Sequence, residues 1–583
     1  METIKKLKNT ENLAAKLITR LFTAWIAASL IFLIINNRSF TDLEYFKFGN
    51  IFIFAGIVIA LFAVLCLIKN DKTISGAMIL LCFIYCLGGV YQCNDFYFIL
   101  SCCGVISGVV YYAKISEIRL TISKKPMWAA VWVLILLFTV FMSISCCLRY
   151  KNYYTPCYDF GIFSQMFYNI NETGLPLTTC ERDKLLSHFA VHFSPAFYLI
   201  FPIYKLVPSP MTLMAAQCFL PALGAVPLIK ICQNRKLSNP ASLCFAACFL
   251  LYLPIGGSCN YYIHENNFLP PLILSLIYFM EKGKTAPALV FGILTLLTKE
   301  DSPVYVAVIA LYFIFANKNY KCSIPLLLIS IVYFMAVTYY LSVSGDGVMT
   351  SRYQNYIYDG SGSLLTVIKA VLQNPLYALQ QSVTEAKIKY ILQMLAPMLF
   401  LPLCIKKPSR IILLIPFILV NLMTNYRYQY DIMYQYGFGS GSLLMYLAAD
   451  NFGQIKKGQG RTKLLLCCLL CSSLMFFGTF GRWLNFYEEY SLCADSRKTI
   501  DYAVSLIPDD ASVVSSTFIL PNVSQRKEVY QLETTENIGE YYILDLRFGS
   551  EKYDLDDFMT DEYKQIYLKE NVVAVFKRKS YDR

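Results

Sequence analysis

The densest polar run of the sequence follows an apolar segment, 127–148, that is long enough to cross a membrane. The run reads Tyr158-Asp159-Phe160-Gly161-Ile162-Phe163-Ser164-Gln165. We expect Gly161 to allow a tight turn, so that Asp159 projects at the membrane boundary. A carboxylate in that place can act as the general base for an acceptor hydroxyl or as a ligand of a divalent cation. The alternative is that Asp159 caps a helix expected at 160–169, and spacing alone favours the cap.

The sequence has three histidines, His188, His192 and His264. The first two are four residues apart, so on a helix they share one face. With Asp159 nearby they could hold a divalent metal ion, Mg²⁺ or Mn²⁺. The alternative is that they pin an interfacial helix by hydrogen bonds, which is favoured because no third ligand is fixed by the sequence.

Further charged groups stand at the outer ends of apolar segments. His264-Glu265 follows an expected turn at Gly256-Gly257, and Lys299-Glu300-Asp301 ends a short apolar run. Charges at membrane depth usually face a cavity or each other. These groups therefore either form a polar cavity, or Lys299 simply neutralises Glu300 or Asp301.

Cations and aromatic residues complete the outer surface. Arg352, Lys387, Lys389 and Arg427 suit a phosphate group, although some of them would merely be solvated. The tyrosine-rich stretch 426–436, which includes Tyr434, fits a headgroup-level belt as well as a wall on which a sugar stacks. No Walker loop, dinucleotide fingerprint or nucleophile elbow is placed where it could work, which argues against an ATP-driven mechanism.

Composition places these groups in a membrane protein. Hydrophobic residues make up 56% of the 583 residues, charged residues only 15%, and the mean hydropathy is +0.48. A soluble globular chain carries about 25% charged residues. Apolar runs recur between residues 17 and 483, and they predict a mainly α polytopic protein of about fifteen transmembrane helices. The basic start, with Lys5, Lys6 and Lys8, leads into a span without a small-residue cleavage site, so we expect an anchor and no cleaved signal peptide.

The net charge of +12 divides into +19 for residues 1–483 and −7 for residues 484–583. Predicted inner loops carry 25 of the 39 Lys and Arg residues before the tail. This asymmetry predicts a cytoplasmic N-terminus and an extracytoplasmic C-terminal domain. It makes nucleic-acid binding a poor explanation of the basic charge. A span at 188–207 would invert every later loop, and Pro195 and Pro202 also argue for an element that lies along the outer interface.

Three regions are expected. Residues 1–126 form four spans, residues 127–483 form an eleven-span body with an outer loop at 149–210, and residues 484–583 form a small α/β domain. In that domain the patterns predict helices at 496–506 and 556–567 and strands at 512–516, 528–532, 541–546 and 572–577.

These motifs together resemble a bacterial membrane family, domain of unknown function twenty seventy-nine. The resemblance covers roughly residues 127–580 and leaves the first four spans outside it. It is carried by the run 158–165, by His188-Phe189, His192-Phe193-Ser194-Pro195, Gln217, Ala222-Leu223-Gly224-Ala225-Val226-Pro227-Leu228, His264-Glu265, Lys299-Glu300-Asp301 and Tyr434-Gln435-Tyr436, and in the tail by Ile507-Pro508-Asp509-Asp510-Ala511-Ser512-Val513 and Ser524-Gln525-Arg526. Family members often carry a histidine where this chain has Gln435.

That family resembles the GT-C superfamily of membrane glycosyltransferases, which use a polyprenyl-phosphate-linked sugar and a catalytic acid in the first long outer loop. Asp159 is the matching position. The resemblance implies a protein of the inner membrane of a bacterium that transfers a sugar from such a donor to an envelope polymer or lipid acceptor outside the cytoplasm. Together with the charged and aromatic positions above, this gives the predicted catalytic residues Asp159, Glu265 and Asp301, and the predicted substrate-binding residues Gln165, His188, His192, His264, Lys299, Glu300, Arg352, Arg427 and Tyr434. A metal ion would lie at Asp159, His188 and His192.

Two other functions stay open. A transporter or flippase of a lipid-linked envelope precursor would spread acids and bases through the depth of the bilayer, whereas here they gather at one face. In a non-catalytic envelope scaffold, the tail domain would be the functional part.

Overall fold

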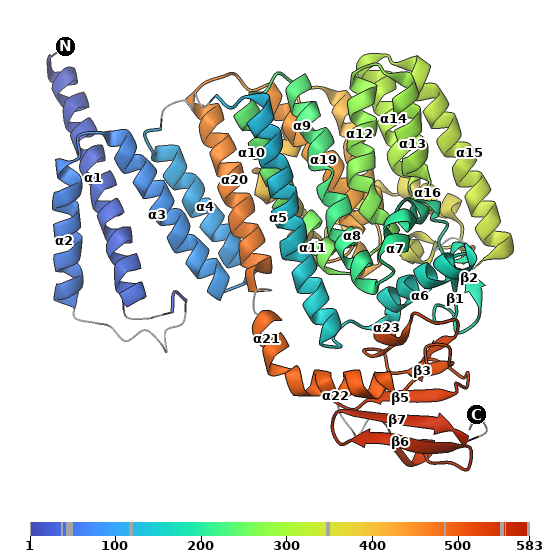
Figure 1. The fold of residues 1–583 in the computed structure, drawn as a ribbon. Helices are drawn as coiled ribbons and strands as arrows, with labels where there is room; N and C mark the ends of the chain where they lie inside the picture. The colour runs from blue at the N-terminus through green and yellow to red at the C-terminus, as the bar shows by residue number, and fades with distance from the viewer. Residues whose placement is uncertain are drawn as a thin grey trace.

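The computed structural model describes residues 2–35, 39–41, 51–115, 121–345, 350–482, 486–548, 553 and 555–579. The protein is mainly helical, with a cluster of helices above a small C-terminal sheet (Figure 1). Within the described ranges, seven helices are long and apolar enough to cross a membrane. These candidate spans are Leu13–Ile35, Asp71–Gln92, Lys124–Lys151, Pro210–Asn234, Asn239–Asn260, Tyr320–Ser344 and Gln459–Phe480. The chain is thus a multi-pass membrane protein, whereas the expected number of about fifteen spans stays a prediction.

The first four helices stand beside the body of the protein (Figure 1). They are α1 (Glu2–Ile35), α2 (Ile51–Leu67), α3 (Asp71–Gln92) and α4 (Phe96–Tyr112). Arg20 and Asp71 form an ion pair of 3.0 Å between α1 and the start of α3. Helices α3 and α4 pack against α20 (Gln459–Phe480) and thereby attach this group to the body.

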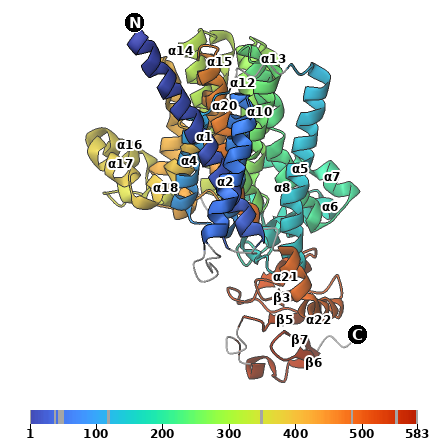
Figure 2. The same ribbon diagram turned by 90° about the vertical axis from the view of Figure 1, so that its left-hand side faces the viewer.

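The body begins with α5, three residues before the expected boundary at residue 127. Its helices are α5 (Lys124–Lys151), α8 (Pro210–Ala222), α9 (Ala225–Asn234), α10 (Asn239–Leu250), α11 (Leu253–Asn260), α12 (Leu269–Glu281), α13 (Thr285–Leu296), α14 (Pro303–Asn317), α15 (Tyr320–Ser344), α16 (Leu364–Gln373), α17 (Pro375–Ser382), α18 (Glu385–Leu395), α19 (Gly437–Gly453) and α20. Between α18 and α19 the chain forms short helical turns: Ala396–Met398, Leu401–Leu403, Pro408–Leu414, Phe417–Leu422 and Arg427–Tyr430. In Figure 2, α16, α17 and α18 extend from one side of the body.

The loop between α5 and α8, called the outer loop after its predicted side of the membrane, folds from short elements. They are α6 (Cys157–Thr173), the paired strands β1 (Leu177–Thr178) and β2 (Leu186–Ser187), the turns η1 (His188–Ala190) and η2 (Pro195–Leu199), and α7 (Phe201–Leu206). The segment 188–207 therefore forms three short helices and no single spanning helix, as its prolines predicted.

The C-terminal part has the helices α21 (Phe486–Leu492), α22 (Ala494–Ser505) and α23 (Leu520–Val523), the turn η12 (Leu555–Phe558), and five strands among the described residues. The strands are β3 (Val513–Ser515), β4 (Val529–Gln531), β5 (Tyr541–Asp545), β6 (Tyr563–Lys569) and β7 (Val573–Arg578), in the order β4-β3-β5-β7-β6. Strand β3 is parallel to both β4 and β5, and β7 is antiparallel to β5 and β6. The expected domain boundary at residues 483 and 484 lies outside the described residues.

The helix predicted at 556–567 is wrong. Only Leu555–Phe558 is helical, as a single turn, and Tyr563–Lys569 forms the edge strand β6. The acidic residues at the start of this segment are typical of the first turn of a helix, where negative charge is favourable. Pairing with β7 overrides that local preference, because the tyrosines and Ile566 of β6 also suit a strand.

Candidate active site

A cavity of about 730 Å³ lies where the outer loop meets the α11–α12 connection and the tyrosine-rich segment 426–436. Seven of the residues singled out in the sequence line it: Asp159, His188, His192, His264, Lys299, Arg352 and Tyr434. They come from segments that are far apart along the chain, so the fold brings them together.

Asp159 lies in the first turn of α6, whose N-cap is Pro156. The predicted capping role is therefore wrong, because α6 begins three residues earlier than the sequence suggested. The side chain of Asp159 faces the cavity and is 30% exposed. Its Oδ2 accepts a hydrogen bond from the Tyr261 hydroxyl and lies 3.7 Å from Nε2 of His264. The ring of His264 stacks on that of Tyr261, with 3° between the two planes.

The position of Asp159 depends on how α6 packs against the C-terminal domain. Gly161 is a helical residue of α6, so the predicted tight turn is also wrong. A Cβ at Gly161 would lie 2.7 Å from Cδ2 of Leu520, on α23. Tyr153 and Cys157 belong to the same buried cluster as Leu520 and Val513 of the C-terminal domain. Glycine is thus needed for close approach of two elements, and this contact fixes the helix that carries Asp159.

Gly257 has a similar packing role. It lies within α11, where a turn was expected, and its missing side chain leaves room for the carbonyl oxygen of Ile432. The carbonyls of Asn260 and Tyr261, at the C-terminal end of α11, accept hydrogen bonds from the Arg149 guanidinium. These contacts position the segment that presents Tyr261 and His264.

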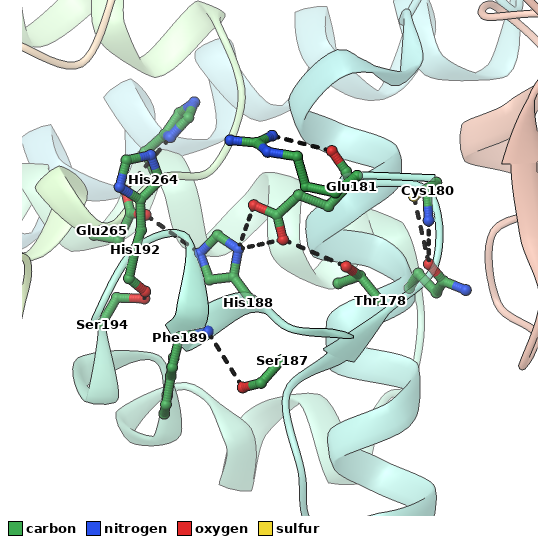
Figure 3. A network of polar contacts seen from close by, with 12 residues as sticks. Thr178, Cys180, Glu181, Ser187, His188, Phe189, His192, Ser194, His264 and Glu265 are labelled. Carbon is green, nitrogen blue, oxygen red and sulfur yellow. Dashed lines mark hydrogen bonds and ion pairs between the residues drawn. The ribbon is translucent and has the colours of Figure 1, made fainter. Parts of the chain in front are cut away.

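Glu265 is the centre of a buried charged network behind the cavity wall (Figure 3). Its Oε1 lies 3.4 Å from Nε2 of His188. Its Oε2 lies 3.5 Å from Nδ1 of His264 and 3.5 Å from Nζ of Lys299. No part of the Glu265 side chain is exposed. One carboxylate therefore holds three nitrogen-bearing side chains from three segments.

His188 has a second carboxylate on its other side, as Figure 3 shows. Nδ1 of His188 lies 3.0 Å from both oxygens of Glu181, and the Thr178 hydroxyl donates to Glu181 at 3.3 Å. Sequence reasoning missed Glu181. The charged run Cys180-Glu181-Arg182-Asp183-Lys184 in the same loop was a signal, but only the β1–β2 pairing folds it back onto His188.

The pKa shifts at the site follow from these contacts. Burial lowers the pKa of His188, but Glu181 and Glu265 outweigh it and raise the pKa to about 10. Burial raises the pKa of Asp159, but His264 and the hydrogen bond from Tyr261 bring it below its usual value. Burial also acts to raise the pKa of Glu265, and Lys299, His188 and His264 bring it well below the usual range. At neutral pH the site therefore holds charged carboxylates and a charged His188.

The cations of the cavity lie against tyrosine rings. The Arg352 guanidinium is 5.0 Å from the ring centroid of Tyr426 and 5.2 Å from that of Tyr436, and it donates to the Tyr436 hydroxyl at 3.2 Å. Nζ of Lys299 is 5.9 Å from the centroid of the same Tyr436 ring. Tyr436 therefore lies next to both cations, and Tyr428 and Tyr434 extend the aromatic wall beside them.

Like Glu265, four further predicted site residues lie outside the cavity lining. The amide of Gln165 is buried and bonded to Thr179 and to the carbonyls of Arg526 and Lys527, so it joins α6 to the C-terminal domain. Arg427 is exposed and outside the cavity lining, with its guanidinium over Tyr428. Glu300 bonds His192 at 2.8 Å behind the lining, and Asp301 follows it in the same turn. Their neighbour Lys299 is the member of this motif that lines the cavity.

The donor set does not fit the predicted metal site. Both ring nitrogens of His188 lie against carboxylates, and a charged imidazole has no lone pair for a metal. Nδ1 of His192 is bonded to Glu300. Across the described part of the chain, no group of three or more His, Cys, Asp or Glu side chains could hold a metal ion. Metal dependence stays a prediction, and no step below relies on it.

Comparison with known families decides the affiliation of the chain. The model of the family described as "Predicted membrane protein (DUF2079)" matches residues 149–557. The chain belongs to this family. The DUF2079 match confirms the resemblance inferred from the motifs, contains every residue of the cavity described above, and leaves α1–α4 outside.

Among solved structures, this DUF2079 protein is similar to ArnT from Cupriavidus metallidurans in the apo state. The identity is 10% and the TM-score 0.41, over 78% of this chain and 98% of that chain. A search of curated proteins gives no match.

Proposed function

We propose that this DUF2079 protein is a membrane glycosyltransferase that moves a sugar from a polyprenyl-phosphate donor to an acceptor at the extracytoplasmic face of the membrane. One observation carries the proposal: a single cavity combines a charged, partly exposed Asp159 with the cations Lys299 and Arg352 and a wall of tyrosines. This combination supplies a base, a phosphate site and a surface on which a sugar stacks.

Asp159 is the proposed base. Tyr261 and His264 both hold its Oδ2, which leaves Oδ1 for the acceptor hydroxyl. As the acceptor oxygen attacks the anomeric carbon, its proton passes to Asp159. The bond from that carbon to the phosphate oxygen breaks, and the electron pair leaves with polyprenyl phosphate. A direct displacement of this kind inverts the anomeric configuration.

Lys299 and Arg352 are the proposed phosphate anchors. Charge builds up on the departing phosphate in the transition state, so cations already in place stabilise it more than they stabilise the bound donor. Glu265 contacts Lys299 directly, and Tyr436 lies against both cations. We assign Glu265 a positioning role, because it is fully buried behind the lining and does not face the cavity.

The same proposal places the C-terminal domain outside the cytoplasm of a bacterial inner-membrane protein, with the N-terminus inside. It is supported by the 25 Lys and Arg residues of the predicted inner loops and by the −7 charge of the tail. The cavity and the C-terminal domain lie at the same end of the helical body, because α6 lines the cavity and packs against α23, which in turn contacts β3 and β4. The domain would then orient the acceptor beside Asp159.

The test is transfer by the purified full chain in lipid nanodiscs. Radiolabelled polyprenyl-phosphate sugars are offered with envelope lipid or polymer acceptors, and both labelled product and released polyprenyl phosphate are measured. A second arm follows movement of a fluorescent lipid-linked sugar across proteoliposomes. Formation of labelled product together with an equal amount of released polyprenyl phosphate supports the proposal. Movement of the lipid-linked sugar without transfer from any donor would overturn the proposal in favour of a transporter. The absence of both transfer and movement would overturn it in favour of a scaffold.

A further inference from the structure

A second cavity, of about 630 Å³, lies far from the proposed active site. It is formed around the starts of α10 and α20 and around the segment that joins α19 to α20. Figure 1 shows these helix ends at the end of the body away from the C-terminal sheet. Three cations stand at this cavity: Lys236, Lys457 and Arg461.

These cations differ from the other basic residues of the same end. Arg235 lies 2.6 Å from Asp450 and also contacts Glu281, and Arg410 lies 2.5 Å from Asp450. Those arginines are thus neutralised inside the protein. Lys236, Lys457 and Arg461, in contrast, have no carboxylate partner among the residues that the structure describes. The guanidinium of Arg461 lies 4.7 Å from the ring centroid of Phe452, which holds it at the cavity wall.

The rest of the lining is apolar and follows the helices away from the cations. Arg461, Leu465 and Leu469 are spaced by four residues, so they lie on one face of α20. At 1.5 Å of rise per residue, this face runs for about 12 Å along the helix axis from Arg461 to Leu469. Cys244 of α10 lines the same cavity from the facing helix. The end of the cavity that carries the three cations therefore continues into an apolar groove between α10 and α20, which belong to candidate spans.

We infer that this cavity binds one anionic phospholipid from the membrane leaflet at that end of the body. The phosphate would lie between Lys236, Lys457 and Arg461, and an acyl chain would lie along the α10–α20 groove. The charge complementarity favours a phosphate, and basic pockets between transmembrane helices are known to hold anionic headgroups. The apolar groove favours a lipid over free inorganic phosphate, because free phosphate gains nothing from Leu465 and Leu469. This inference does not rest on the proposed transferase activity.

The test is lipid binding by the delipidated full chain, followed by native mass spectrometry and by thermal unfolding. The added ligands are phosphatidylglycerol, phosphatidylcholine and inorganic phosphate. We expect phosphatidylglycerol to bind and to raise the unfolding temperature by several degrees, and the other two to do neither. The variant K236Q/K457Q/R461Q should bind phosphatidylglycerol at least tenfold more weakly.

The matched control is K282Q/K406Q/K407Q, which removes the same charge at the same end of the protein. All three control lysines are exposed and lie outside the cavity lining. Lys282 follows Glu281, and Lys406 and Lys407 precede Arg410, so they adjoin the ion pairs of this end. The control should retain the wild-type response. An equal loss in both variants would overturn the inference, because the effect would then be general surface charge.

Two single variants keep the test decisive if the triple variant does not fold. R461Q removes the headgroup contact, and L469W fills the apolar groove while leaving the three cations in place. Both should weaken phosphatidylglycerol binding. Wild-type binding by both variants, or stabilisation by inorganic phosphate alone, would overturn the assignment of a lipid site.

Discussion

Nε2 of His188 lies 3.4 Å from Oε1 of Glu265, and both side chains are almost completely buried. This contact joins the outer loop to the α11–α12 connection behind the cavity. Because Glu265 also contacts His264 and Lys299, its single negative charge compensates several groups at once. A buried carboxylate in such a position should matter for stability more than for chemistry.

We therefore expect Glu265→Gln to destabilise the protein by about 3–5 kcal/mol, because Lys299 would keep a buried charge without its contacting carboxylate and His188 would retain only Glu181. The apparent unfolding temperature in detergent measures the effect. Glu172→Gln is the control, since Glu172 is exposed at the far end of α6. Equal unfolding temperatures for the two variants would contradict the network.

The pH dependence of stability should report on His188. Its pKa is about 10 in the folded protein and about 6.5 when unfolded, so its contribution is complete below pH 6.5 and is lost as the pH rises toward 10. The stability difference between wild type and His188→Gln should shrink by about 1.4 kcal/mol per pH unit in this window. Thermal unfolding of both proteins from pH 6 to 10 checks this. A difference that stays constant would show that His188 is neutral in the folded state.

The packing of α6 on the C-terminal domain can be tested with Gly161 and Leu520. Gly161→Ala should cost about 1–3 kcal/mol, because the new methyl group would overlap Cδ2 of Leu520. Adding Leu520→Ala to this variant should cost less than it does in the wild type, since the two sites share one contact. Unfolding temperatures of the two single variants and the double variant complete the cycle. Simple additivity would mean that the contact is absent.

The two arginines proposed from the sequence should now behave differently. Arg352→Gln removes a cation of the cavity wall, so we expect kcat/KM for the donor to fall roughly 100-fold. Arg427→Gln removes an exposed charge outside the lining and should retain nearly full activity. Steady-state transfer with varied donor measures both. The reverse order of effects would move the phosphate site to Arg427.

The sequence predicted which residues come together in the cavity better than it predicted the contacts between them. Charges at the ends of apolar runs indicated that Asp159, His188, His264 and Lys299 share one face, and the cavity contains all four. Spacing could not show that Glu265 lies between His188 and Lys299, because that contact depends on the packing of separate segments. Gln165 was misjudged for a related reason: an amide that holds two backbones together has the same sequence pattern as one that binds a substrate.

Errors in local structure arose where tertiary contacts override local preference. Gly161 suggested a turn, but the requirement comes from Leu520, which lies 359 positions later in the sequence. The acidic start of 556–567 suggested a helix, but its second half pairs with β7. Leu520 belongs to an element that no local window around Gly161 contains, whereas β7 is separated from β6 by only three residues and acts through strand pairing.

The central claim is that Asp159 acts through its negative charge. Asp159→Asn retains an oxygen that can accept the hydrogen bond from Tyr261, so the variant should fold with an unfolding temperature close to that of the wild type. It loses the base, so the rate of transfer should fall roughly 100-fold or more. The decisive measurement is transfer of radiolabelled sugar from polyprenyl-phosphate donors by Asp159→Asn, with Glu172→Gln as control and thermal unfolding measured beside it. The account predicts a well-folded Asp159→Asn protein with little transfer and a fully active control, whereas transfer at the wild-type rate by well-folded Asp159→Asn would contradict it.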